Sequence, residues 1–124
     1  MSMGLTAPGI ASITIDAADP YRLAGFWSAL LGLAVTEVGP DYAELAPLYD
    51  GGPTLLFIQV PEDKVVKNRV HLDLAVDDVG ASVEQALTLG ATEAKGELAG
   101  PFAWKVLQDP EGNEFCLCPR EGGS

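Results

Sequence analysis

His71 and Asp73 are the residues of this sequence whose types and spacing most directly suit chemistry. They stand two positions apart in Val70 to Val76 (VHLDLAV), whose alternation is typical of a β-strand. Side chains two positions apart on a strand point to the same face, so the imidazole and the carboxylate would be neighbours. The carboxylate would fix the ring tautomer, which suits His71 to proton transfer as a general acid or base. The alternative is a structural histidine, with Asp73 paired to Lys67 or Arg69.

The two cysteines, Cys116 and Cys118, both stand in the segment EFCLC near the end of the chain. Two positions apart on a strand is too far for an easy disulfide, so we expect reduced thiols. Nucleophilic catalysis by Cys116 would need His71 as its base, since the chain has one histidine. A small buried side chain is the simpler interpretation of Cys116. Two cysteines and one histidine also cannot make a four-ligand structural zinc site without carboxylates.

Two further groups of residues are candidates for ligand contacts. Phe102 and Trp104 alternate on one face of the segment FAWKVLQ and could wall a ligand site, although core packing is commoner for such residues. Lys64, Lys67 and Arg69 are clustered and could hold an anionic group at a cavity mouth. The alternative for these three cations is a solvated linker.

The overall charge argues against one class of partner. The 124 residues include 18 acidic and 7 basic ones, which gives a formal net charge of −11. Such a surface repels phosphate backbones, so we expect no nucleic-acid binding, whereas a cationic ligand would be attracted. The acidity also serves simply to keep a protein in solution. No apolar run is long enough to span a membrane, and Met1 to Pro8 does not read as a secretion signal, so we expect a cytoplasmic protein.

Hydrophobic periodicity predicts the elements that position these residues. Ile10 to Asp16 alternates as a strand does, Asp19 and Pro20 suit the start of a helix, and apolar residues at helical spacing lead to a stop at Gly32. Three strands should follow, separated by turns rich in glycine and proline, over 33–38, 42–45 and 54–60.

The same order of elements then repeats. After a polar linker over 61–69, the strand over 70–76 leads to an acidic helix cap at Asp77 and Asp78 and to a helix stop at Gly90. Three more strands are predicted over 91–95, 102–108 and 114–118. The repeat indicates one α+β domain over 1–124, built from two βαβββ half-repeats, 10–60 and 70–118. A ferredoxin-like domain is the alternative, but three strands after each helix count against it.

Three segments of the chain stand in an order typical of a known family. They are Asp19 to Leu33 (DPYRLAGFWSALLGL), His71 to Asp78 (HLDLAVDD) and Asp109 to Leu117 (DPEGNEFCL). Together they resemble the small glyoxalase/bleomycin-resistance/dioxygenase proteins of the vicinal-oxygen-chelate superfamily, over about residues 10–119. The resemblance implies βαβββ modules that curl into a concave, cup-shaped sheet, and a homodimer. It also implies that His71 and Asp73 face that concave surface. The family hosts many chemistries, so the resemblance does not give the reaction.

The resemblance also implies where a metal ion would be held. Metal-dependent members use one side chain from the first strand and one from the fourth strand of each half. These positions fall here on Ser12, Ile58 or Gln59, His71 and Cys116. Ser12 is not a normal ligand, and Cys116 replaces the family's last glutamate, with Glu114 one step nearer the turn. We therefore expect no metal and no other cofactor. If an ion is held, His71, Gln59 and Cys116 would hold zinc or iron.

Three functions stay open on this evidence. The first is a metal-independent lyase or isomerase, in which His71 and Asp73 move a proton on a small carbonyl-bearing substrate. The second is a non-catalytic protein that sequesters a drug or metabolite, as bleomycin-resistance relatives do; the missing metal ligands and the acidic surface favour it. The third, disfavoured by the missing ligands, is a divalent-metal glyoxalase or dioxygenase. In each case the ligand contacts would include Gln59, Phe102, Trp104 and Cys116.

Overall fold

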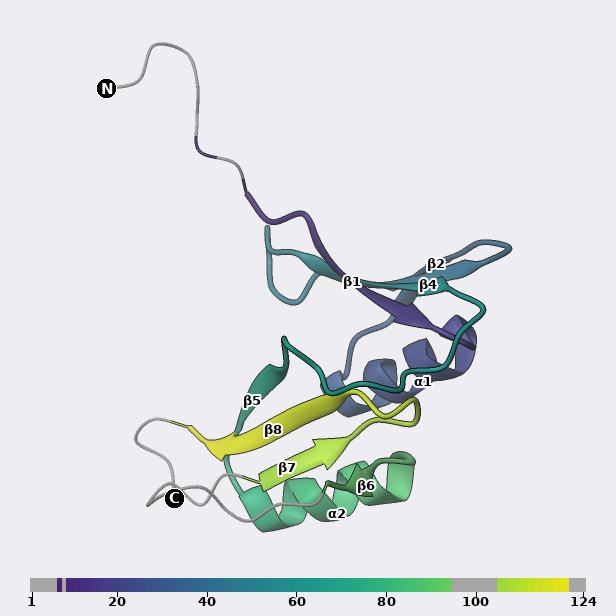
Figure 1. Ribbon diagram of the computed structural model, residues 1–124. Helices are drawn as coiled ribbons and strands as arrows, with labels where there is room; N and C mark the ends of the chain where they lie inside the picture. The colour runs from purple at the N-terminus through teal and green to yellow at the C-terminus, as the bar shows by residue number, and fades with distance from the viewer. Residues whose placement is uncertain (1–6, 8, 95–104, 121–124) are drawn as a thin grey trace.

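Two βαβββ modules make up the computed structural model, which describes residue 7 and residues 9–94 and 105–120 (Figure 1). The first module contains β1 (Ser12–Ala17), α1 (Pro20–Leu31), β2 (Val35–Val38), β3 (Tyr42–Leu45) and β4 (Thr54–Gln59). The second contains β5 (Leu72–Val76), α2 (Val79–Leu89), β6 (Thr92–Glu93), β7 (Lys105–Gln108) and β8 (Glu114–Pro119). The predicted α+β class and the repeated order of elements are confirmed.

Each module forms its own four-stranded sheet, and the two sheets share one topology. The strand orders are β1-β4-β3-β2 and β5-β8-β7-β6. In both sheets the first strand of the module pairs in parallel with the last, and the other neighbours are antiparallel. In the described part of the chain, each module therefore contributes a separate four-stranded sheet.

Both helices begin and end at the residues that the sequence indicates. Asp19 and Asp78 are the N-caps, and each carboxylate accepts a hydrogen bond from a backbone N–H three residues further on. At the other ends Gly32 and Gly90 adopt φ values of 69° and 122°, which residues with a Cβ rarely take. In the part of the chain that the structure covers, no helix is long and apolar enough to cross a membrane.

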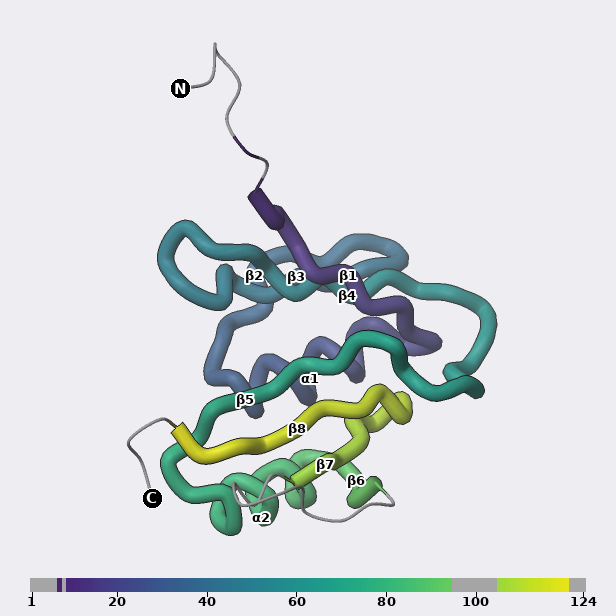
Figure 2. Tube along the Cα trace, turned by 60° about the vertical axis from the view of Figure 1, so that its left-hand side comes forward, coloured from purple at the N-terminus to yellow at the C-terminus, as the bar shows by residue number. Residues whose placement is uncertain are grey.

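Helix α1 lies between the two sheets and joins the cores of the modules (Figures 1 and 2). Its buried residues Phe26 and Trp27 contact Phe115 of β8, with ring centroids 6.0 and 4.9 Å apart, respectively. On its other side α1 packs against β3 and β4, where Leu45, Phe57 and their neighbours are fully buried. One helix of the first module therefore stabilises both sheets by burying apolar surface.

Hydrogen bonds from the turn between β7 and β8 attach the second module to α1. The buried Asp109 carboxylate accepts a 3.0 Å hydrogen bond from Trp27 Nε1 and further bonds from backbone N–H groups of its own turn. Two residues on, the Glu111 carboxylate accepts hydrogen bonds from the backbone N–H groups of Ala18 and Asp19, at 2.8 and 2.7 Å. These hydrogen bonds fix the position of the second module relative to α1.

Candidate functional site

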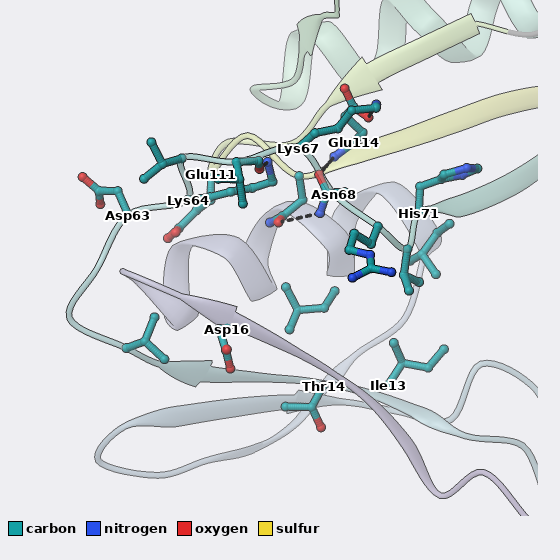
Figure 3. Close-up of a pocket in the computed structure, with 18 of the residues that line it drawn as sticks. Ile13, Thr14, Asp16, Asp63, Lys64, Lys67, Asn68, His71, Glu111 and Glu114 are labelled. Carbon is teal, nitrogen blue, oxygen red and sulfur yellow. Dashed lines mark hydrogen bonds and ion pairs between the residues drawn. The ribbon is translucent and has the colours of Figure 1, made fainter.

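A cavity of about 620 Å³ lies between the first module and the segment that joins the two modules (Figure 3). We call residues 60–71, between β4 and β5, the connecting segment; the predicted linker over 61–69 falls inside it. Apolar side chains of β1 and α1 form one wall, namely Ile13, Ile15 and Trp27. The connecting segment forms the opposite wall. Pockets of about 300–1,000 Å³ with mostly apolar walls are typical of small-molecule sites.

Polar contacts hold the connecting segment against the second module. Asn68 Oδ1 accepts a 2.9 Å hydrogen bond from the backbone N–H of Glu114, and Lys67 Nζ lies 2.6 Å from the Glu114 carboxylate. Figure 3 shows these residues on the side of the cavity opposite Ile13 and Thr14 of β1. Lys64, Lys67 and Arg69 all line the cavity, as the sequence allowed. The connecting segment is therefore a wall of the cavity as well as a linker.

His71 lies at the end of the connecting segment, lines the cavity, and pairs with Asp73. Its Nδ1 is 2.9 Å from Asp73 Oδ1. Both side chains are about half exposed, at 48% and 40%, so solvent and a ligand can reach them. Lys67 pairs with Glu114, so the alternative pairing of Asp73 with Lys67 is not observed. With the carboxylate on Nδ1, the other ring nitrogen, Nε2, is left for proton exchange.

Cys116 completes a cluster with His71 and Asp73. Strands β5 and β8 run in parallel, and Asp73 and Cys116 are direct partners in their register. One ring nitrogen of His71, one carboxylate oxygen of Asp73 and the Cys116 sulfur all lie within 4.8 Å of one another. Burial, and then the charge of Asp73, raise the pKa of the Cys116 thiol from 9.0 to about 11. A thiol protonated at neutral pH is a weak nucleophile, which argues against covalent catalysis by Cys116.

The other predicted site residues do not join this cluster. Gln59 ends β4 in the first sheet, where its side-chain nitrogen donates a 3.3 Å hydrogen bond to the carbonyl of Ala18. It is not among the residues that line the cavity. Phe102 and Trp104 lie outside the described residues.

The metal set implied by the family does not fit this chain. Ser12 lies on β1, and strand register gives Leu56 of β4 as the partner of Thr14, just as Cys116 is the partner of Asp73. Neither the serine hydroxyl nor the leucine is a suitable metal ligand. Asp73 was not predicted as a possible metal ligand. Its spacing of two residues from His71 is the signal in the sequence, and the parallel pairing of β5 with β8 brings Cys116 beside it.

Comparison with known proteins agrees with this fold. The model of a family described as a glyoxalase-like domain matches residues 12–118. No curated protein matches the chain. Among solved structures, a glyoxalase/bleomycin resistance protein/dioxygenase family enzyme from Burkholderia phytofirmans PsJN superposes with a TM-score of 0.71 at 21% identity, covering 90% of this chain and 98% of that one.

Two resistance proteins have similar structures. The fosfomycin resistance protein FosX from Mesorhizobium loti gives a TM-score of 0.71 at 14% identity, over 94% of this chain and 95% of that one. A bleomycin resistance determinant encoded on the transposon Tn5 gives 0.63 at 21% identity, over 92% and 99%. At these identities the likeness concerns the fold alone. With two βαβββ modules and a family match over 12–118, the chain belongs to the glyoxalase-like domain family of the vicinal-oxygen-chelate superfamily.

Proposed function

We propose that this protein binds a small organic molecule in the cavity between β1, α1 and the connecting segment. The observation that carries the proposal is a cavity of about 620 Å³ with Ile13, Ile15 and Trp27 on one side and a mixture of valines and polar or charged groups on the other. An apolar wall supplies affinity by burying ligand surface, and a few polar groups at the rim orient the ligand. The fold shared with proteins named for fosfomycin and bleomycin resistance supports a role in binding small molecules.

A ligand screen with matched variants tests this proposal. Small antibiotics, organic acids and organic amines would be screened by thermal shift, and hits would be measured by isothermal titration calorimetry. Ile15→Gln puts an amide into the apolar wall, whereas Val38→Gln makes a similar change at an exposed position on β2. We expect the first variant to weaken binding about tenfold or more and the second to leave it unchanged. Equal affinities in both variants, each checked for folding by circular dichroism, would contradict a site in this cavity.

A second candidate function is metal-free proton transfer by His71 and Asp73, of the lyase or isomerase type. Their 2.9 Å contact beside the cavity favours it, because a ring oriented by a carboxylate can shuttle a proton at a carbonyl-bearing ligand. In an enzyme of this kind His71→Ala would abolish turnover of a bound hit and leave its affinity within a few-fold. A hit that binds but is never converted by the unmodified protein would instead identify a sequestering protein.

We also propose that the protein is a cytoplasmic homodimer. The face of the first sheet that points away from α1 carries half-buried apolar side chains, such as Leu56 and Ile58, next to polar ones. A second copy could cover this face and so bury apolar surface. Both cysteines are unpaired thiols, which suits a reducing compartment. Light scattering after size-exclusion chromatography tests the dimer: a mass of 13.0 kDa at micromolar concentration would contradict it.

A further inference from the structure

Arg69 is a cationic side chain on the wall of the cavity that has no acidic partner. It is exposed, it lines the cavity, and it forms no ion pair with any residue that the structure describes. The other two cations of this wall are engaged, since Lys67 pairs with Glu114 at 2.6 Å and Lys64 Nζ donates to the carbonyl of Val66. The five N–H donors of a guanidinium therefore remain for a ligand at Arg69.

The backbone on both sides of Arg69 is attached to the second module. Just before it, Asn68 Oδ1 accepts a 2.9 Å hydrogen bond from the backbone N–H of Glu114. Shortly after it, Leu72 begins β5 and is the register partner of Phe115 on β8. Because the Cα of Arg69 lies between these two attachments, less conformational freedom is lost when its side chain binds a ligand.

Two of the acidic residues that line the cavity already have partners. The two carboxylate oxygens of Glu111 accept hydrogen bonds from the backbone N–H groups of Ala18 and Asp19, at 2.8 and 2.7 Å. Glu114 is paired with Lys67. Neither carboxylate is therefore left to neutralise Arg69.

The other acidic residues that line the cavity lie away from Arg69. Asp16 alternates along β1 with the apolar residues of the wall, and Figure 3 shows its carboxylate on the side of β1 that faces away from the connecting segment. Glu62 and Asp63 belong to the start of the connecting segment. Figure 3 shows Asp63 at one end of this segment and His71 at the other, and Arg69 is close to His71 in the chain.

The charge of the whole chain and the charges beside Arg69 favour different ligands. The formal net charge of −11 would by itself attract a cation. At physiological ionic strength, however, charges more than about 8 Å apart are largely screened, so the groups on the wall decide. The Lys67–Glu114 pair is neutral overall. Asp73 pairs with His71 and does not line the cavity. An anionic group is therefore favoured at Arg69.

The opposite wall of the cavity favours an apolar group. Ile13 and Ile15 present hydrocarbon side chains to it. The indole N–H of Trp27, the one polar group of that side chain, already donates a 3.0 Å hydrogen bond to Asp109. A polar part of a ligand would lose its contacts with water here and gain no partner among these side chains.

We propose that the ligand of this cavity is an amphipathic organic carboxylate. Its apolar part lies against Ile13, Ile15 and Trp27, and its carboxylate forms a bidentate pair with the guanidinium of Arg69. A carboxylate fits better than a dianion, because one guanidinium matches one negative charge. This inference rests on the proposed function, since it names the class of molecule that the same cavity binds.

Ligands that share a skeleton and differ only in the head group test this inference. Phenylbutyrate, phenylbutyramide and phenylbutylamine form one set, and octanoate, octanamide and octylamine form another. Each would be titrated into the full-length protein by isothermal titration calorimetry. We expect the carboxylate of a set to bind about tenfold or more tightly than its amide or amine. An amide or amine that binds as tightly as the carboxylate of its set would overturn the inference.

The cavity variant Ile15→Gln separates this inference from the proposed function. Neither carboxylate might bind while neutral or cationic hits of the ligand screen do bind and are weakened by Ile15→Gln. That result would overturn the carboxylate and leave a small-molecule site in the cavity. If no ligand of any charge responds to Ile15→Gln, both proposals fail.

Matched arginine variants identify the group that holds the carboxylate. Arg69→Gln should reduce the affinity for phenylbutyrate to that for phenylbutyramide and leave the affinity for the amide unchanged, because only the ionic contact is lost. Arg69→Lys should keep part of the preference, since it retains the charge without the planar fork. Arg22→Gln changes an exposed arginine of α1 that does not line the cavity and should alter neither affinity. A preference for the carboxylate that persists in Arg69→Gln would overturn the inference.

Lys64→Gln distinguishes the two cations that have no carboxylate partner. Lys64 already donates to the carbonyl of Val66, so we expect this variant to change the preference for the carboxylate by less than about threefold. Both Lys64→Gln and Arg69→Gln alter side chains on the surface of the connecting segment, so both should fold normally. Loss of the preference in Lys64→Gln but not in Arg69→Gln would overturn the assignment to Arg69.

Discussion

The two modules have one topology but differ in what their paired first and last strands present. In the first module, Ser12 and Thr14 of β1 stand beside Leu56 of β4. In the second, His71 and Asp73 stand in the equivalent places beside Cys116 of β8. Both strand pairs are parallel, although the first pairing includes Ser12 and the second begins only after His71. Of these two strand pairs, the second is the one that brings an imidazole, a carboxylate and a thiol together.

The turns that precede the last strands differ in the same way. In the second module Asp109 is 2% exposed and accepts hydrogen bonds from Trp27 and its own turn. In the first module the corresponding turn contains the exposed Asp50. The second module is therefore locked to α1 at the edge of the cavity, next to the residues that could act on a ligand.

The largest expected effect on stability comes from removing the Asp109 carboxylate. Asp109→Ala leaves the buried indole N–H and backbone N–H groups without partners, so it should lower the free energy of unfolding by about 3 kcal/mol. Asp50→Ala, the matched change in the first module, should alter it by less than about 0.5 kcal/mol. Urea denaturation of both variants measures this difference. Similar losses in the two would mean that the modules are equally dependent on their turns.

The pH dependence of stability should also belong to the second module. The pKa of Cys116 is raised from 9.0 to about 11, so the folded state retains a proton that the unfolded state loses. The free energy of unfolding should therefore be unaffected by this group below about pH 9 and fall as the pH rises toward 11. Denaturation of metal-free protein at pH 8, 9.5 and 11 measures the fall. In Cys116→Ser this part of the pH dependence should disappear, and its persistence would assign it to another group.

The smallest effect on stability is expected for His71. Its side chain is 48% exposed, and its contact with Asp73 is a surface pair, so His71→Ala should change the free energy of unfolding by less than about 0.5 kcal/mol. A large loss of stability in His71→Ala, measured by urea denaturation, would instead make His71 a structural residue.

The starts and ends of the helices were predicted well from the sequence, because they depend on residues that are neighbours in the chain. Asp19 and Asp78 cap the helices, Gly32 and Gly90 end them, and the helix bounds follow. Strand ends were less accurate: the strand predicted from Ile10 begins at Ser12, since the ladder starts only where β4 can pair.

The candidate site depends on long-range contacts, which hydrophobic periodicity does not predict. The pairing of His71 with Asp73 was predicted from their spacing of two residues, although His71 lies just before β5 and not on it. The proximity of Asp73 to Cys116 follows from the register of strands over forty residues apart, which the sequence pattern alone does not fix. The apolar wall formed by Ile13, Ile15 and Trp27 was missed, because it arises from packing between distant segments. The cations of the connecting segment that line the cavity had been considered as ligand contacts.

The most direct test of the central claim, a small-molecule site in this cavity, is a nuclear magnetic resonance titration of the ¹⁵N-labelled protein with a hit from the ligand screen. We predict that the shifted amide signals concentrate on Ile13 to Ile15, on the connecting segment and on His71, which line the cavity. Shifts confined to β2 and β3, on the far edge of the first sheet, would contradict the account.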